Sequence, residues 1–118
     1  MTDEQEICDL LAEEVMGWKL DNNHTGDKVW KETKNGHSWN PYYVDEWQPT
    51  QNIEHALKCA EKYCKGHHCT YAVEGSFIRE DLSNYGTYWC GVNSARGQGT
   101  EKTPELAICS ALVEAVMK

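Results

Sequence analysis

The stretch Ala95-Arg-Gly-Gln-Gly-Thr-Glu-Lys-Thr-Pro-Glu-Leu-Ala-Ile-Cys109 carries the clearest structural pattern in the chain. It is typical of a glycine-bearing loop that leads into a helix. Thr103 is suited to the N-cap, and Pro104 stands at the first helical position, where proline is favoured. The apolar residues from Leu106 to Val116 then cover a broad face, which predicts a well-buried C-terminal helix.

The same stretch suggests a site for an anion. A helix N-terminus presents unpaired backbone N–H groups and a partial positive charge, which suit a phosphate. Arg96 and Lys102 would supply charge beside the helix start at Thr103, and Gly97 and Gly99 would let the backbone approach the ligand closely. The alternative is that both glycines only turn the chain and that Arg96 pairs with a surface acid. No Walker or Rossmann pattern accompanies the stretch.

Two further helices are predicted upstream. The first has Thr2 as its N-cap and Gly17 as its C-terminal cap, with apolar residues recurring on one face between them. The second begins after Thr50 or Asn52, either of which can serve as its N-cap, and ends at Gly66.

Two hairpins lie between these helices. Asn35-Gly36 predicts a type I′ turn, because both of its central residues need a positive φ, and it would join strands over residues 28–33 and 37–43. We expect residues 21–27 to form a loop ahead of this hairpin. The second hairpin would use residues 69–77 and 87–93, joined by a polar connection over 79–86.

The expected order is therefore helix, hairpin, helix, hairpin, helix. It indicates one α+β domain over residues 1–118, in which an antiparallel β-sheet of about four strands is layered between α-helices.

Composition narrows the classes of partner. The chain has 19 acidic against 11 basic residues and a net charge of −8, which argues against binding long nucleic acid. An acidic N-terminus, and the absence of an apolar run of about 18–20 residues, indicate no export signal and no membrane association. We therefore expect a cytoplasmic protein whose six cysteines are reduced thiols.

An aromatic segment could hold a nucleobase. Trp39, Asn40, Tyr42, Tyr43 and Trp47 lie within nine residues, and bases are bound by stacking on such rings while amides contact their edges. The alternative is that alternate rings build the core, which we favour for Trp47 and for Trp30, whereas Trp18 is expected to be a packing anchor.

The segment Cys64-Lys-Gly-His-His-Cys69 offers two thiols and two imidazoles that could contribute to a zinc site, with Cys90 and His55 as further ligands. Its C-x4-C spacing is wider than that of the usual zinc knuckle. We expect instead a helix end followed by a strand, with no metal and no cofactor. No catalytic motif is present, so we do not expect an enzyme.

Three ordered motifs resemble the phage ABA sandwich domain family. They are Val15-Met-Gly-Trp-Lys19, then Trp47-Gln-Pro-Thr50 leading to Ile53 and Ala56, and finally Ala95-Arg96 with Thr103-Pro-Glu-Leu-Ala-Ile-Cys109 and Ala111. Together they span nearly the whole chain. The resemblance implies helix and sheet layers and a phage protein acting in the cytoplasm of an infected bacterial cell.

Small phage proteins of similar architecture include sponges that bind ADP-ribose derivatives or cyclic nucleotides of host immunity without cleaving them. By this analogy we expect a non-enzymatic anti-defence protein that sequesters a small nucleotide-derived signal as a homo-oligomer, with pockets near subunit interfaces. The alternatives are an interaction module that inhibits a host protein by direct contact and a hydrolase acting on the same signals.

Overall fold

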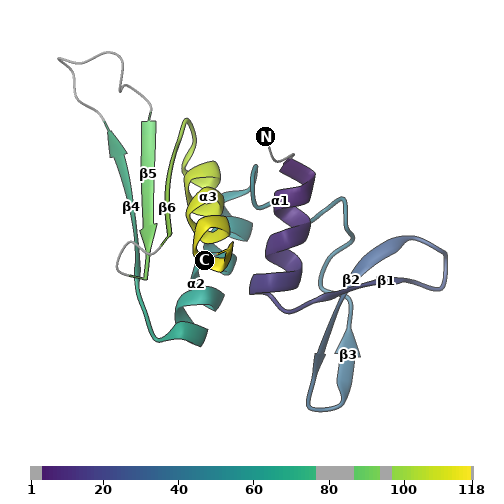
Figure 1. Cartoon of the computed structure of the whole chain (residues 1–118). Helices are drawn as coiled ribbons and strands as arrows, with labels where there is room; N and C mark the ends of the chain where they lie inside the picture. Colours follow the sequence, from purple (N-terminus) through teal and green to yellow (C-terminus); the bar gives the residue numbers. More distant parts are fainter. Residues whose placement is uncertain (1–3, 77–86, 94–96, 118) are drawn as a thin grey trace.

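The computed structural model describes residues 4–76, 87–93 and 97–117 of the chain (Figure 1). Within these residues the elements are α1 (Glu4–Leu10), η1 (Leu11–Val15), β1 (Lys19–Asn22), β2 (Lys28–Lys34), β3 (His37–Trp39), α2 (Ile53–His67), β4 (Tyr71–Ser76), β5 (Thr87–Val92), β6 (Gly97–Glu101) and α3 (Pro104–Met117). The α+β class is confirmed. The strands form two antiparallel sheets, β1-β2-β3 and β4-β5-β6.

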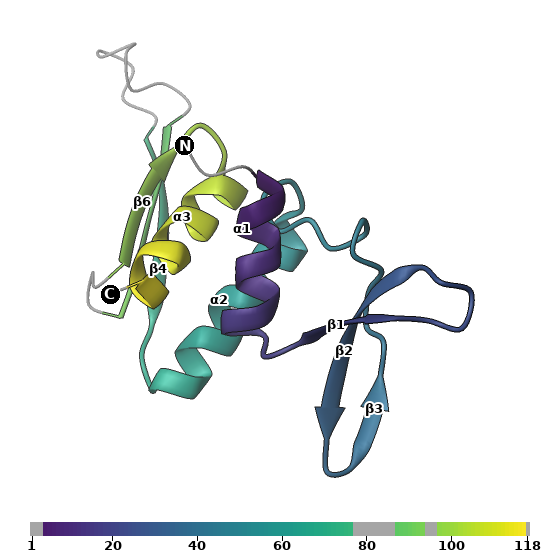
Figure 2. The ribbon, with the colours of Figure 1, turned by 45° about the vertical axis from the view of Figure 1, so that its right-hand side comes forward.

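Helix α3 packs against one face of the β4-β5-β6 sheet, mainly over β5 and β6 (Figures 1 and 2). Contact with β6 is close because Gly97 and Gly99 face the helix. A Cβ on Gly99 would lie 2.6 Å from both the Ala107 carbonyl oxygen and the Ser110 Cβ, and a Cβ on Gly97 would lie 2.7 Å from the Ala115 Cβ. The prediction of a glycine loop is therefore wrong for residues 97–101, which form β6.

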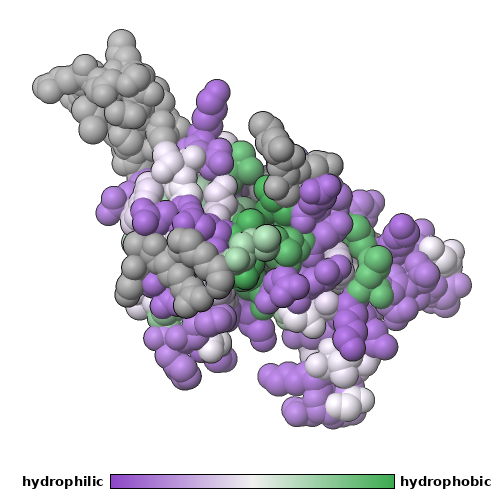
Figure 3. All heavy atoms as spheres, viewed as in Figure 1, coloured by the Kyte–Doolittle hydropathy of each residue, from purple (hydrophilic) through white to green (hydrophobic). Residues whose placement is uncertain are grey.

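On its other side, α3 contacts α1, η1 and α2. This position between a sheet and helices explains why α3 is apolar around most of its circumference. Its fully buried side chains include Ile108, Cys109 and Leu112, which join a core that also contains Leu11, Trp47 and Cys59. On the face of the molecule in Figure 3, hydrophobic residues gather over α1 and α3, and the β1-β2-β3 sheet is mostly hydrophilic.

The β1-β2-β3 sheet extends away from the helices as an arm of a molecule that measures 55 × 30 × 23 Å (Figure 2). The predicted turn at Asn35 and Gly36 is confirmed, with φ of 54° and 80°. The second strand of this hairpin, β3, ends at Trp39 and not at residue 43 as predicted, because Pro41 has no N–H to donate. Beyond it, a single bridge pairs Val29 with Tyr43.

The helix ends partly match expectation. Asn52, one of the two predicted caps, accepts hydrogen bonds from the backbone N–H groups of Glu54 and His55. Helix α2 ends at His67, and its C-cap residue His68 adopts the left-handed conformation (φ 52°), so the predicted ending at Gly66 is wrong. Thr103 Oγ1 accepts from the Leu106 N–H at 3.2 Å and confirms the α3 cap. The predicted cap Thr2 lies outside the described residues. No described helix is long and apolar enough to cross a membrane.

Candidate functional site

The predicted aromatic segment divides between core and surface. Trp47 is fully buried, its ring stacks on His55 at 4.9 Å between centroids, and it meets Trp18 edge-on at 4.7 Å. Its Nε1 donates to the Cys8 carbonyl oxygen at 3.2 Å. The assignment of Trp47 to a ligand site is therefore wrong, because core side chains occupy its ring faces and its polar atom. The packing alternative is confirmed for Trp47, as it is for the buried Trp18 and Trp30.

Tyr42 and Tyr43 line a pocket that the backbone builds after β3. This cavity of about 220 Å³, the tyrosine pocket, is lined by Asn23, Val29, Asn40, Pro41, Tyr42, Tyr43 and Glu46. Lys58 Nζ donates to the Tyr42 hydroxyl at 2.7 Å and fixes that ring. Three predicted residues, Asn40, Tyr42 and Tyr43, therefore come together. Trp39 does not line the pocket, and its ring is 43% exposed on β3.

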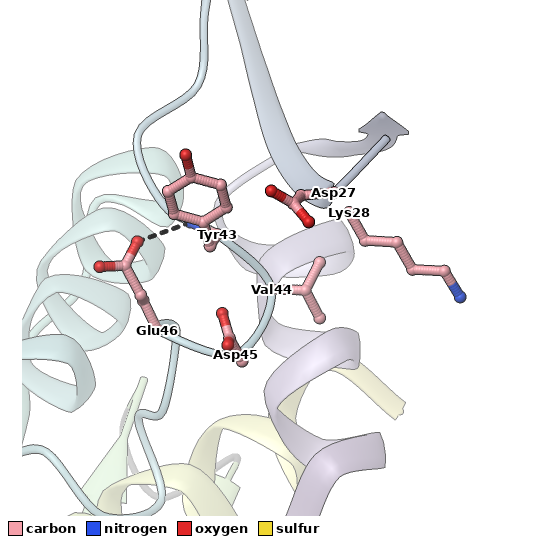
Figure 4. A pocket seen from close by; sticks show the side chains of 6 residues that line it. All are labelled: Asp27, Lys28, Tyr43, Val44, Asp45 and Glu46. Atoms are coloured by element: carbon pink, nitrogen blue, oxygen red, sulfur yellow. Dashed lines mark hydrogen bonds between the residues drawn. The ribbon is translucent and has the colours of Figure 1, made fainter. Parts of the chain in front are cut away.

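A second cavity adjoins the first and shares Tyr43 and Glu46 with it. This acidic pocket of about 570 Å³ is lined by Asp27, Lys28, Tyr43, Val44, Asp45 and Glu46. Figure 4 shows the Lys28 side chain pointing away from the three carboxylates, while Glu46 Oε1 accepts from the Tyr43 backbone N–H at 3.1 Å. The sequence pattern did not indicate this pocket, because only the fold brings Asp45 and Glu46 to Asp27.

The predicted phosphate site does not have the expected geometry. Gly97 and Gly99 are buried beneath α3, so neither presents an open backbone to a ligand. Lys102 is exposed and Thr103 is half-buried at the start of α3, while Arg96 lies outside the described residues. The residues that line the tyrosine pocket all lie between Asn23 and Glu46, and the start of α3 contributes none of them. Lys102 and Thr103 therefore do not share this pocket with the aromatic residues.

The Cys64–Cys69 region forms a helix end, as expected. The His67 ring stacks on Tyr63 at 4.1 Å between centroids, and its Nδ1 lies 2.9 Å from the Tyr63 carbonyl oxygen. In the part of the chain that the structure describes, no three His, Cys, Asp or Glu side chains are grouped to hold a metal ion. All six cysteines are free thiols.

Comparison with known proteins identifies the family of this chain and a solved structure with a similar fold. Residues 9–113 match the phage ABA sandwich domain. The fold is also similar to the crystal structure of a phage protein from Bacillus cereus ATCC 14579, with a TM-score of 0.59, 18% identity, and coverage of 98% of this chain and 94% of that chain. At that identity the likeness concerns the fold alone. No curated protein matches the chain. The chain belongs to the phage ABA sandwich domain family.

Proposed function

We propose that this phage protein is a non-enzymatic anti-defence protein that binds and sequesters a small nucleotide-derived immune signal, such as an ADP-ribose derivative or a cyclic nucleotide. The tyrosine pocket is the observation that supports this function. It combines the exposed ring of Tyr43 with the side-chain amides of Asn23 and Asn40 around about 220 Å³ of space. The Tyr42 ring on its wall packs against Trp18, Trp47 and His55. Rings can stack on a base, and amides can bond its edges.

Charge orients the ligand in this proposal. Asp27, Asp45 and Glu46 make the neighbouring pocket acidic, so a phosphate placed there would face like charge. The base therefore occupies the tyrosine pocket, and the phosphates extend away from the acidic pocket. The tyrosine pocket is open to solvent at the half-exposed Tyr43, and a second copy of the chain would bury more of the ligand. We therefore propose a homo-oligomer in the host cytoplasm.

Ligand retention tests the proposal. The purified protein is incubated with cyclic ADP-ribose isomers and cyclic dinucleotides, separated from free ligand and heat-denatured, and the released compounds are identified by mass spectrometry. We expect one compound to be recovered intact from the wild type, and to be lost from Tyr43→Ala because a stacking ring is removed.

Trp39→Ala is the matched control, because Trp39 is an equally exposed ring on the same arm but lies outside the pocket. It should retain the compound. Recovery of an altered product would mean an enzyme, and retention of nothing would contradict the sponge.

A direct-contact inhibitor is the second candidate, and the acidic pocket favours it. Its three carboxylates suit a basic side chain of a partner protein, and the arm also exposes Leu20 and Trp39. A short oligolysine peptide serves as the probe. Binding by the wild type that Asp27→Asn with Asp45→Asn abolishes would support this contact, and equal binding by the double variant would contradict it.

A further inference from the structure

We infer that Lys19 and Lys31 on the arm form the anion subsite for the phosphates of a nucleotide-derived ligand. This inference rests on the proposed function and deepens it, because it assigns the phosphate half of the site. Both halves then lie on one chain, and the start of α3 is not needed for binding.

The register of the arm places two like charges together. Strands β1 and β2 are antiparallel, and Lys19 lies directly opposite Lys31. Residues that face each other in an antiparallel pair project from the same side of the sheet, and like charges at such positions repel. No described residue forms an ion pair with either lysine. In a chain of net charge −8, this pair of facing lysines is suited to an anionic ligand.

The lysines lie on the side of the sheet that carries the tyrosine pocket. Val29 lines that pocket and is bridged to Tyr43, which lines it too. Lys31 follows Val29 by two residues, so both project from the same face, with about 7 Å between their Cα atoms. The ribose of a nucleotide separates base from phosphate over a comparable span. A base beside Tyr43 therefore places its phosphate near Lys31 and Lys19.

Neighbouring groups set the direction along this face. Asp21 lies opposite Val29, and Glu46 lines the pocket, so the carboxylates lie at the pocket end. Thr33 follows Lys31 on the same face, and its hydroxyl lies 3.0 Å from that of Ser38. The end of this face that carries the lysines therefore also carries hydroxyl groups. The electrostatic gradient therefore favours one orientation, with the base near the carboxylates and the phosphate near the lysines.

Three probes test the subsite: ADP-ribose, adenosine and inorganic pyrophosphate, each titrated into isotope-labelled protein and followed by NMR. We expect wild type to bind ADP-ribose more tightly than adenosine. The double variant Lys19→Gln with Lys31→Gln should bind ADP-ribose at least about tenfold more weakly and adenosine equally well. Lys62→Gln with Lys65→Gln is the matched control, because both lysines are exposed on α2 and the charge change is the same. It should bind like the wild type.

The outcomes separate this inference from the proposed function. Tight ADP-ribose binding that survives in the Lys19/Lys31 variant but is lost in Lys102→Gln would overturn the subsite and leave the sponge standing. If neither ADP-ribose nor adenosine binds, the proposed function fails for this ligand class. The pyrophosphate titration then tests the lysine subsite alone. Saturable shifts confined to the amides around Lys19 and Lys31 support the subsite, and their absence overturns it. A melting temperature no lower than that of wild type shows that the variant is folded.

Discussion

At the scale of single residues, Gly97 and Gly99 set how closely β6 approaches α3. Gly99→Ala would place a Cβ 2.6 Å from the Ala107 carbonyl oxygen, so strand and helix must separate. We expect the free energy of unfolding to fall by about 1–3 kcal/mol, the usual cost of overpacking. Urea denaturation measures this change.

Gly66→Ala is the control. Gly66 lies within α2, and a Cβ there would meet no atom within 4 Å. Because alanine favours helix over glycine, this variant should gain about 0.5–1 kcal/mol. If both variants lost equal stability, backbone freedom and not close packing would explain the glycine in β6.

His55 makes folding sensitive to pH. Its Nδ1 accepts from the Gln48 backbone N–H at 3.1 Å. Burial lowers its pKa below the usual 6.5, and Lys58 adds to the effect. The unfolded chain therefore takes up the proton first as the pH falls. The stabilisation is complete above about pH 6.5 and is lost below it.

Urea denaturation at about pH 7.5 and about pH 5.5 tests this effect. Wild type should lose more stability over that interval than His55→Asn, whose side-chain oxygen can replace the acceptor without titrating. Equal losses would show that His55 does not contribute to the pH dependence.

The aromatic segment shows what sequence leaves open at this scale. Four aromatic candidates, Trp39, Tyr42, Tyr43 and Trp47, lie in this segment, and no regular period separates them. Pro41 ends the strand pairing, and the chain then turns so that Trp47 enters the core while Tyr43 stays half-exposed. Burial was therefore set by the path of the loop, which residue type alone does not determine.

At the scale of elements, the N-cap of α2 is held by one side chain. Asn52 Oδ1 accepts from the Glu54 N–H at 2.9 Å and from the His55 N–H at 3.3 Å. Asn52→Ala should lower the free energy of unfolding by about 0.5–2 kcal/mol, because both donors lose their partner. Gln51→Ala, at the exposed preceding position, should have little effect in the same urea experiment. An equal effect would mean that loop composition, and not the cap, matters.

Helices and strands differ in how well the sequence predicts them. Caps and apolar periodicity are local, and they located α2 and α3 closely. Strands β1 and β6 were missed because Lys-Leu-Asp-Asn and Gly-Gln-Gly-Thr-Glu have few β-branched or aromatic residues. Each is a strand because it pairs with a neighbour, β2 or β5, and β6 is also covered by α3. Tertiary contacts decided these elements.

At the scale of the whole molecule, the reactivity of the thiols measures how well the core excludes solvent. Burial raises the pKa of Cys64 to about 12 and that of Cys90 to about 11, and it also raises the pKa values of Cys8, Cys59 and Cys109. Cys69 alone of the six is partly exposed. With a thiol reagent we expect Cys69 to react fast and the others only after unfolding.

Cys69→Ser should remove the fast phase and leave the slow phases unchanged. Fast reaction at several sites in the folded protein would contradict the closed core.

The fold class followed from the order of elements along the sequence, but the division into two sheets did not. Both hairpins have similar strand patterns, and no local sequence pattern indicates whether the strands of one hairpin pair with those of the other. In the structure, α2 separates them along the chain, and each sheet pairs within itself. The candidate site was partly predicted, because Asn40, Tyr42 and Tyr43 are neighbours in sequence, whereas Val29 of β2 reaches the same pocket through its bridge to Tyr43.

The position of α3 between the sheet and the other helices also bears on the order of folding. Its contacts with β6 and β5 join neighbours in sequence, and its contact with α1 joins the two ends of the chain. Closing the longer loop costs more entropy, so we expect the β5-β6-α3 unit to assemble first and α1 to dock last. Gly99→Ala should then lower the refolding rate, whereas Leu11→Ala in η1 should mainly raise the unfolding rate. The glycine contact that brings β6 close to α3 would thus act as the folding nucleus.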